Sequence, residues 1–326
     1  MTTAQLNVSG TCYSLCSSHR QIGRVSGKGR HHLWNNISQI YDARSDYDKA
    51  LKYLEQSLEI SQNIGDRAGE GVTLNNIGQI YKARGEYDTA LKYLEQSLDI
   101  FREIGAKSEE GTTLNNISLI YKARGEYDKA LKYLEQSLEI SQEVGDRAGE
   151  GTTLGNIAGI YRARGEYDTA LKYLEQSLEI SQDIGDRAGQ GTTLNNISQI
   201  YHARGDYATA LKYLEQSLDI RQEIGDKAGE DNSLNNIGRI YEARGDNAKA
   251  LQYYKQSLAI QQEIGNRYGE AVTSWNIGMI YKKQGDLAKA EQYISRAVEL
   301  AKAIGHPSLE EWREGLEELR AAIKGR

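Results

Sequence analysis

The stretch ALKYLEQSL at residues 50–58 decides how this chain folds, because it recurs without a change every 40 residues. Its unaltered copies begin at Ala50, Ala90, Ala130, Ala170 and Ala210, and weaker copies begin at Ala250 and Ala290. A fixed period of this length is typical of a repeat array, in which each repeat buries its apolar face only against its neighbours. We therefore expect an elongated array of seven repeats over residues 31–308.

Within the repeat that starts at Asp66, apolar residues fall at helical spacing in two sets. The sets are Leu74, Ile77, Gly78 and Tyr81, and then Ala90, Leu91, Leu94, Leu98 and Ile100. Gly85 separates them and Gly105 closes the second, as glycine commonly does after a helix. The repeat is predicted to be a helix pair, with an inner helix at about 67–84 and an outer helix at about 86–104. Two residues just beyond such glycines are predicted N-caps, namely Asp66 and Asp146.

The residue types at fixed positions of the repeat resemble the tetratricopeptide repeat family. They are Trp34, Ile37, Ser38 and Tyr41, followed by Ala50 and Leu54. The period of 40 exceeds the family's usual length of about 34 residues, and Ile-Gly replaces its terminal proline. The chain is in this respect most similar to the long-repeat branch of kinesin light chains and spindle-orientation scaffolds. The resemblance implies an all-α, right-handed superhelical solenoid whose inner helices line a peptide-binding groove.

The two ends of the chain depart from the repeat. Residues 309–326 are predicted to form a capping helix and tail, introduced by a capping box between Ser308 and Glu311. Residues 1–30 fit neither a repeat nor a cap, and Arg30-His31-His32 stands where other repeats have Gly-Thr-Thr. Our hypothesis is that this disordered or irregular segment is a frameshift product. An uncapped N-terminal end would then favour self-association.

Composition argues against several classes of function. The net charge of −6 gives no reason to expect nucleic acid or membrane binding. Cys12 and Cys16 lie outside the repeats, so a disulfide is not needed by the array, and we expect a cytoplasmic protein. These cysteines and His19 do not have zinc-ligand spacing, and the acidic residues repeat in register like a solvated helix face. We expect no enzyme, no catalytic residue, no cofactor and no metal.

An asparagine occupies the same inner-helix position in all seven repeats, although asparagine is a mediocre helix former. One interpretation is a ladder of amides that binds the backbone of an extended peptide, as the resemblance also implies. The alternative is that these amides bond one another between repeats and fix the stacking. The series is Asn36, Asn76, Asn116, Asn156, Asn196, Asn236 and Asn276, with Asn75, Asn115, Asn195 and Asn235 at the position before it.

The same face carries a column of basic residues, so an extended acidic segment is the expected partner. The column is Lys82, Lys122, Arg162 and His202, with Arg239 close by. Specificity is expected where the repeats differ, at Leu119, Gly155, Gly159, Trp275 and Met279. Gly155 and Gly159 are expected to leave a bare patch, whereas Trp275 has an alternative role in packing near the cap. The predicted function is a protein-interaction scaffold. The alternatives are a peptide-responsive sensor and the repeat part of a larger protein that positions a catalytic domain.

Overall fold

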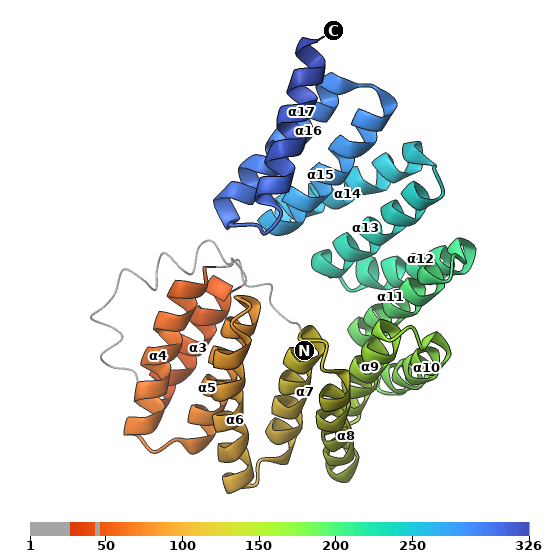
Figure 1. The fold of residues 1–326 in the computed structure, drawn as a ribbon. Coiled ribbons are helices and arrows are strands. Elements are labelled where there is room, and N and C mark those ends of the chain that lie inside the picture. The colour runs from red at the N-terminus through yellow and green to blue at the C-terminus, as the bar shows by residue number, and fades with distance from the viewer. Residues whose placement is uncertain (1–26, 43–45, 326) are drawn as a thin grey trace. The chain divides into compact units, whose positions relative to one another are not determined.

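The computed structural model describes residues 27–42 and 46–325, which form fifteen α-helices and no strand (Figure 1). The helices are α3 (Gly27–Asp42), α4 (Tyr47–Asn63), α5 (Arg67–Ala83), α6 (Tyr87–Ile104), α7 (Lys107–Ala123), α8 (Tyr127–Val144), α9 (Arg147–Ala163), α10 (Tyr167–Asp183), α11 (Arg187–Ala203), α12 (Tyr207–Glu223), α13 (Lys227–Ala243), α14 (Asn247–Ile264), α15 (Arg267–Gln284), α16 (Leu287–Ile304) and α17 (Leu309–Lys324). The chain is an all-α solenoid of helix pairs, as its period predicts.

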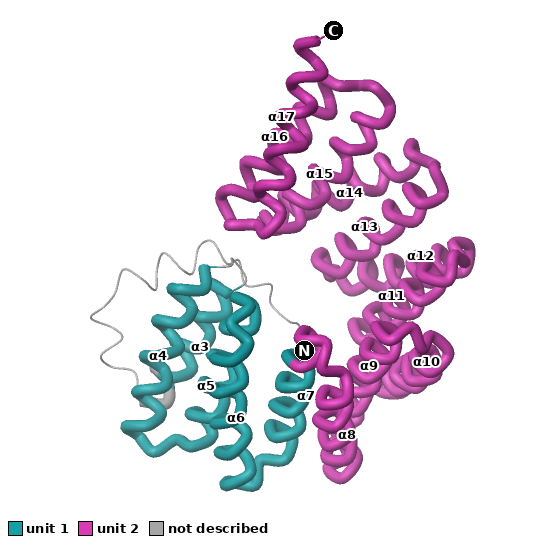
Figure 2. The backbone as a smooth tube through the Cα atoms, viewed as in Figure 1, with its two compact units in different colours: residues 1–120 teal, residues 121–326 magenta. Residues whose placement is uncertain are grey.

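The helices belong to two compact units, residues 1–120 and residues 121–326, which are shown in teal and magenta in Figure 2. In unit 1, α3 packs on α4 and α5 packs on α6. The two pairs are joined by contacts between α4 and α5. In unit 2 the pairs α9–α10, α11–α12, α13–α14 and α15–α16 follow one another, and α17 packs on α16. The first helices of successive repeats also contact each other, as α3 and α5 do in unit 1 and α9, α11 and α13 do in unit 2.

Two small residues in each repeat let its helices approach closely. The alanine that opens each outer-helix copy is fully buried, as Ala90 and Ala290 illustrate. The facing position in the first helix is small for the same reason. A Cβ added at Gly278 would lie 2.5 Å from Ile294 Cγ1 and 3.2 Å from the Ile294 backbone nitrogen. Larger side chains at this position would force the helices apart.

Stacked pairs account for most of the 22 tyrosines of the chain, which has only one phenylalanine. Within each described repeat, the tyrosine near the end of the first helix stacks on a tyrosine of the second helix. In unit 1 the rings of Tyr81 and Tyr93 are 5.5 Å apart and inclined by only 2°. In unit 2 the Tyr161 and Tyr173 rings repeat this geometry at 5.5 Å. Such stacks contribute about 0.5–1.5 kcal/mol beyond the area that they bury.

The predicted helix ends are confirmed. Asp66 Oδ1 accepts a hydrogen bond from the Gly69 backbone nitrogen at 3.0 Å, and Asp146 Oδ1 accepts one from Gly149 at 2.9 Å. Gly85 has a φ of +77°, in the left-handed region where a β-carbon is disfavoured. A capping aspartate at one end and a left-handed glycine at the other therefore delimit the helices at the predicted places.

The C-terminal helix α17 is also confirmed, but its predicted capping box is wrong. The Ser308 side chain makes no capping hydrogen bond, and its ψ of 12° is far from the extended conformation that an N-cap usually adopts. The Ser308 backbone nitrogen instead donates to His306 Nδ1 at 3.0 Å. His306 is buried beside Trp312, so its side chain, rather than that of Ser308, makes the hydrogen bond at the start of the helix.

At the other end, α3 begins at Gly27, ahead of the predicted boundary at residue 31. His31 is buried, and its Nε2 lies 3.1 Å from Gly69 O and 3.0 Å from Thr73 Oγ1. Residues 1–26, which carry most of the predicted frameshift segment, lie outside the described residues.

Candidate functional site

The asparagines of the first helices form hydrogen-bonded pairs between successive repeats. In each pair, Nδ2 of one asparagine donates to Oδ1 of the residue 41 positions earlier. The pairs are Asn76 with Asn35 at 3.2 Å and Asn116 with Asn75 at 2.9 Å in unit 1, and Asn236 with Asn195 at 2.8 Å in unit 2. Asn235 Nδ2 also reaches the next repeat, at Thr273 Oγ1, 2.9 Å away. This geometry supports the stacking interpretation directly, while ligand contact stays a prediction.

The paired amides do not extend through every repeat of the described chain. The residue 41 positions before Asn196 is Gly155, not an asparagine. Neither Asn196 nor Asn276 has a side-chain hydrogen bond within the described part of unit 2. Both side chains are only partly buried, so their donors remain accessible. Asn115 and Asn156 do have partners. The asparagines are thus a mixture of paired and unpaired amides.

The paired amides predict a measurable difference between Asn236 and Asn196. Replacing Asn236 by alanine is expected to lower the free energy of unfolding by about 0.5–1.5 kcal/mol relative to Asn196→Ala, because only Asn236 loses a hydrogen bond. Both substitutions change helix propensity equally, so the comparison isolates the pair. Urea denaturation monitored by circular dichroism measures the difference. Equal stabilities of the two variants would contradict a structural role for the Asn236–Asn195 pair.

Half-buried positions near the ends of the first helices hold the four members of the basic column, Lys82, Lys122, Arg162 and His202. In unit 1, burial lowers the pKa of the Lys82 ammonium, and the nearby Asp42 partly opposes the shift. In unit 2, burial and the neighbouring Arg162 charge lower the pKa of Lys122. Burial also lowers the pKa of the Arg162 guanidinium, whose Nη1 donates to Gln199 Oε1. Lys122 and Arg162 therefore form a cationic pair whose two charges destabilise each other.

Acidic residues at the same helix position interrupt the basic column, and sequence analysis overlooked them. Asp42 lies one 40-residue period before Lys82, and Glu242 lies one period after His202. Glu242 Oε2 accepts a hydrogen bond from Tyr254 Oη at 2.8 Å, and Tyr254 replaces the leucine or isoleucine of other repeats. Comparing this one column along the whole chain would have revealed both acids. Lys282 is a further basic member of this column, and Lys122 and Arg162 are the always basic pair that occupies successive repeats of unit 2.

The residues predicted to confer specificity have different surroundings. A Cβ added at Gly159 would lie 2.6 Å from Lys122 Nζ, so the ammonium already covers this half of the predicted bare patch. A Cβ at Gly155 would meet only Ser177 Oγ, at 3.8 Å, so this half is open. Leu119 in unit 1 is half-buried, and Met279 in unit 2 is exposed. Arg239, which was predicted to lie near the basic column, is also exposed.

Trp275 lies against the capping helix. Its ring stacks on Trp312 at 5.0 Å, and a Cβ added at Gly315 would be only 2.9 Å from Trp275 Cη2. The packing role that sequence analysis held open is therefore present in the structure, and ligand contact at Trp275 stays a prediction.

A small cleft in unit 2 brings together three predicted site residues: His202, Asn236 and Arg239. Burial, and secondarily the Arg239 charge, lowers the pKa of the His202 imidazole. Its protonated form is thus disfavoured near Arg239. Arg239 carries the positive charge of this cleft, and Gln199 at its edge accepts a hydrogen bond from Arg162 of the cationic pair.

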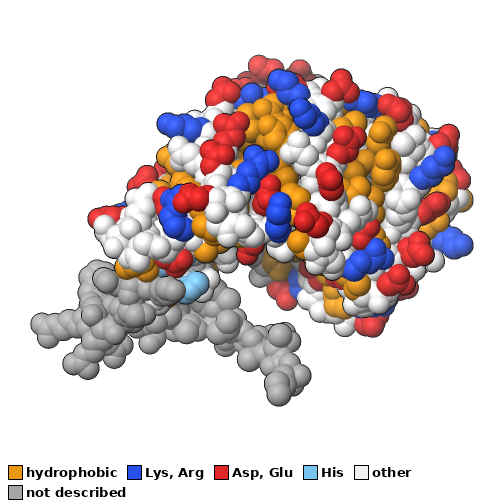
Figure 3. Space-filling view, turned by 90° about the horizontal axis from the view of Figure 1, so that it is seen from below, with side chains coloured by type: hydrophobic (Ala, Val, Ile, Leu, Met, Phe, Trp, Pro, Cys, Tyr) orange, Lys and Arg blue, Asp and Glu red, His pale blue; other side chains and the backbone are white. Residues whose placement is uncertain are grey.

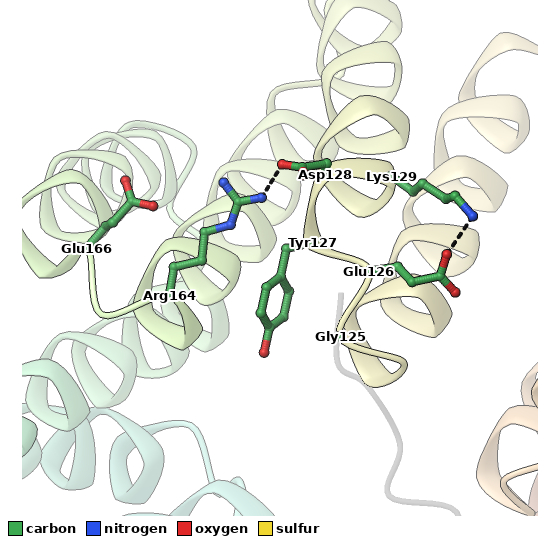
Figure 4. Close-up of a pocket in the computed structure, with 7 residues that line it drawn as sticks. All are labelled: Gly125, Glu126, Tyr127, Asp128, Lys129, Arg164 and Glu166. Carbon is green, nitrogen blue, oxygen red and sulfur yellow. Dashed lines mark hydrogen bonds and ion pairs between the residues drawn. The ribbon is translucent and has the colours of Figure 1, made fainter.

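A larger, open depression lies at the turns between α7 and α8 and between α9 and α10, but four of its five charged residues pair with one another (Figure 4). Arg164 pairs with Asp128, and Lys129 pairs with Glu126 at 2.5 Å. Arg164 belongs to a series whose members also pair across repeats, as Arg204 does with Asp168 at 2.5 Å. These ion pairs link successive repeats.

Surface charge elsewhere is mixed. On the face seen in Figure 3, acidic and basic side chains are interspersed, and stripes of apolar side chains lie between them. No described group of His, Cys, Asp and Glu side chains could hold a metal ion. None of the described helices is both long and apolar enough to cross a membrane.

The sequence matches the family model for the tetratricopeptide repeat at residues 30–103, 109–183, 149–223, 189–263 and 229–303. The chain belongs to the tetratricopeptide repeat family. Proteins of this class are scaffolds for protein interactions, and the all-α helix-pair architecture described above is the one that the class requires. No curated protein matches the chain.

Several solved structures share the fold. Apo RapI has a TM-score of 0.61 and 18% identity, with 84% of this chain and 98% of that chain covered. A Pyrococcus horikoshii signal transduction ATPase with numerous domains and a tetratricopeptide repeat sensor has a TM-score of 0.63 and 18% identity, with 90% of this chain and 44% of that chain covered. A Rap protein complexed with competence and sporulation factor has a TM-score of 0.57 and 14% identity, with 90% and 98% covered. At these identities the likeness concerns the fold.

Proposed function

We propose that this protein is a non-enzymatic, cytoplasmic scaffold that binds an extended, acidic segment of a partner protein along the first helices of unit 2. The observation that carries the proposal is the cationic pair of Lys122 and Arg162. Both side chains are half-buried, and neither forms an ion pair with a carboxylate within the described residues. The nearby cations Arg164 and Arg204 do have such a partner.

The energetic state of the pair favours an acidic ligand. Burial removes water from both cations, and each charge raises the cost of the other. A carboxylate brought to this position replaces the lost solvation and screens the repulsion, so its binding relieves a cost that the free protein bears. An extended backbone beside the pair can also use the accessible amides of the first helices as donors and acceptors.

Charge reversal of the pair tests the proposal. A variant with Lys122→Glu and Arg162→Glu is expected to bind a fluorescein-labelled peptide of alternating Ser and Asp at least about tenfold more weakly than the parent, because attraction becomes repulsion. Fluorescence anisotropy measures the affinity, and a peptide of alternating Ser and Asn is the neutral probe. The matched control carries Lys132→Glu and Lys172→Glu, which make the same charge change at exposed positions of α8 and α10.

The control should lose affinity only slightly, since exposed charges act through screened, long-range attraction. Equal losses in the two double variants would mean that the peptide senses only net charge, and the proposed site would be wrong. Thermal melts of both variants verify that each remains folded.

A regulatory role is the alternative. The similar Pyrococcus protein joins a repeat sensor to an ATPase, and the present chain covers only 44% of it. By that analogy the repeats could serve as a peptide-responsive sensor, or position a catalytic domain in a larger protein. Small-angle X-ray scattering with and without the Ser-Asp peptide distinguishes a sensor, whose dimensions change on binding, from a static scaffold.

A further inference from the structure

The series of asparagine pairs is broken at Gly155, and the break lies beside the cationic pair. Elsewhere, a donor such as Asn236 finds its acceptor at Asn195 Oδ1, 2.8 Å away and 41 residues earlier. For Asn196 the residue 41 positions earlier is Gly155, which has no side-chain acceptor. The Asn196 side chain has no hydrogen-bond partner within the described part of unit 2. One accessible amide donor is therefore left without its usual acceptor.

The vacant position has room for a new acceptor. A Cβ on Gly155 would have one neighbour outside its own helix, Ser177 Oγ at an ordinary contact distance of 3.8 Å. Asparagine fills the equivalent position in other repeats, at Asn35, Asn75, Asn115, Asn195 and Asn235. An acceptor group about as large as one amide is consequently compatible with the packing between repeats.

Positive charge borders this position. Gly159 lies one helical turn beyond Gly155, and Lys122 Nζ is 2.6 Å from the place of a Gly159 Cβ. Lys122 can occupy that place only because residue 159 lacks a side chain. Arg162, which shares α9 with both glycines, influences the Lys122 charge and reaches across to Gln199 on α11. Gly155, Gly159 and Arg162 follow one another at helical spacing on α9, Lys122 lies against Gly159, and Asn196 is on the neighbouring helix α11. We treat these five residues as lining one gap.

We propose that this gap, the Gly155 gap, receives a side-chain carboxylate of the bound protein segment. One carboxylate oxygen accepts the hydrogen bond from Asn196 Nδ2 that an asparagine accepts in other repeats, and the negative charge faces Lys122 and Arg162. A neutral amide could satisfy Asn196 but not the cations, so the gap selects an acidic residue over its amide. The inference rests on the proposed function and specifies where the acidic segment is anchored.

The substitution Gly155→Asn tests the gap by restoring the residue that other repeats have. The new side chain is expected to accept the hydrogen bond from Asn196, fill the gap and weaken binding of the labelled Ser-Asp peptide at least about tenfold. The melting temperature should not fall, because one interrepeat pair is gained and a helical glycine is lost. Gly155→Ala is the matched control: it adds only a Cβ, leaves Asn196 unpaired and should retain most of the affinity.

A double-mutant cycle separates this mechanism from crowding. Asn196→Ala should weaken binding as Gly155→Asn does, and combining the two substitutions should add little further loss, because both remove the same contact. Additive losses, or unchanged affinity in Gly155→Asn, would overturn the Gly155 gap. If Gly155→Asn binds normally while the Lys122 and Arg162 reversal does not, the proposed function stands and only the anchor is wrong. If neither variant loses affinity, both proposals fail.

Discussion

Replacing Trp312 by alanine is expected to destabilise the C-terminal end of unit 2 by about 3–5 kcal/mol, the usual cost of deleting a buried tryptophan side chain. Trp312 is 6% exposed and packs in one apolar cluster with Ala271, Ala297 and Leu300. Its ring also stacks on Trp275 at 5.0 Å and on His306 at 4.6 Å. A single substitution therefore removes most of what holds the start of α17 on the last repeat.

The loss should be local. Repeat arrays are stabilised by contacts between nearest neighbours, so a weakened cap exposes the adjacent helices first. Hydrogen exchange followed by mass spectrometry should show faster exchange in α15, α16 and α17, with little change in α9 and α10. Trp312→Phe is the control, since it keeps an aromatic ring for the stack on Trp275 and should lose much less stability. Uniform acceleration throughout unit 2 would contradict nearest-neighbour coupling at this end.

The fold was predictable because the repeat encodes it redundantly. The helical spacing of apolar residues, the capping role of Asp66 and the left-handed Gly85 each predict the same helix boundaries, and all three are observed. The C-terminal helix was predictable from its apolar stripe. Its start was not, because the Ser308 motif competes with His306, whose position depends on burial against Trp312. A local motif cannot reveal that tertiary contact.

The candidate site was predictable only in part. The first-helix asparagines were identified by their recurrence, but recurrence is equally expected of a stacking contact and of a ligand contact. Distances separate the two, since Asn236 has a partner in the preceding repeat and Asn196 does not. The covering of Gly159 by Lys122 likewise requires coordinates, because the two residues lie 37 positions apart in sequence.

Deviations inside the core escaped notice for a further reason. Sequence analysis searched for variation on the expected binding face, whereas Asp231 replaces a glycine of other repeats at a buried position. Its Oδ1 accepts hydrogen bonds from Ser257 Oγ at 2.6 Å and Gln261 Nε2 at 2.9 Å. No cation pairs with it among the described residues, and burial raises the pKa of the Asp231 carboxyl. An uncompensated buried charge of this kind is costly.

Replacing Asp231 by asparagine is therefore expected to stabilise the protein by about 1–3 kcal/mol near neutral pH. The amide keeps an acceptor for Ser257 and removes the charge. Urea denaturation measures the gain, and Asp219→Asn, at an exposed position of α12, is the control that should change little.

The stabilisation should depend on pH with a definite sign. The pKa of Asp231 is raised above its ordinary value of 3.8 in the folded protein, so between the two values the folded state binds more protons than the unfolded state. The free energy of unfolding of the parent protein consequently carries a penalty from Asp231 that is absent below 3.8 and grows as the pH rises through the folded pKa. Asparagine has no such titration. The advantage of Asp231→Asn over the parent should thus be smallest in acid and reach its full value at neutral pH, and an advantage independent of pH would show that the buried charge is not its cause.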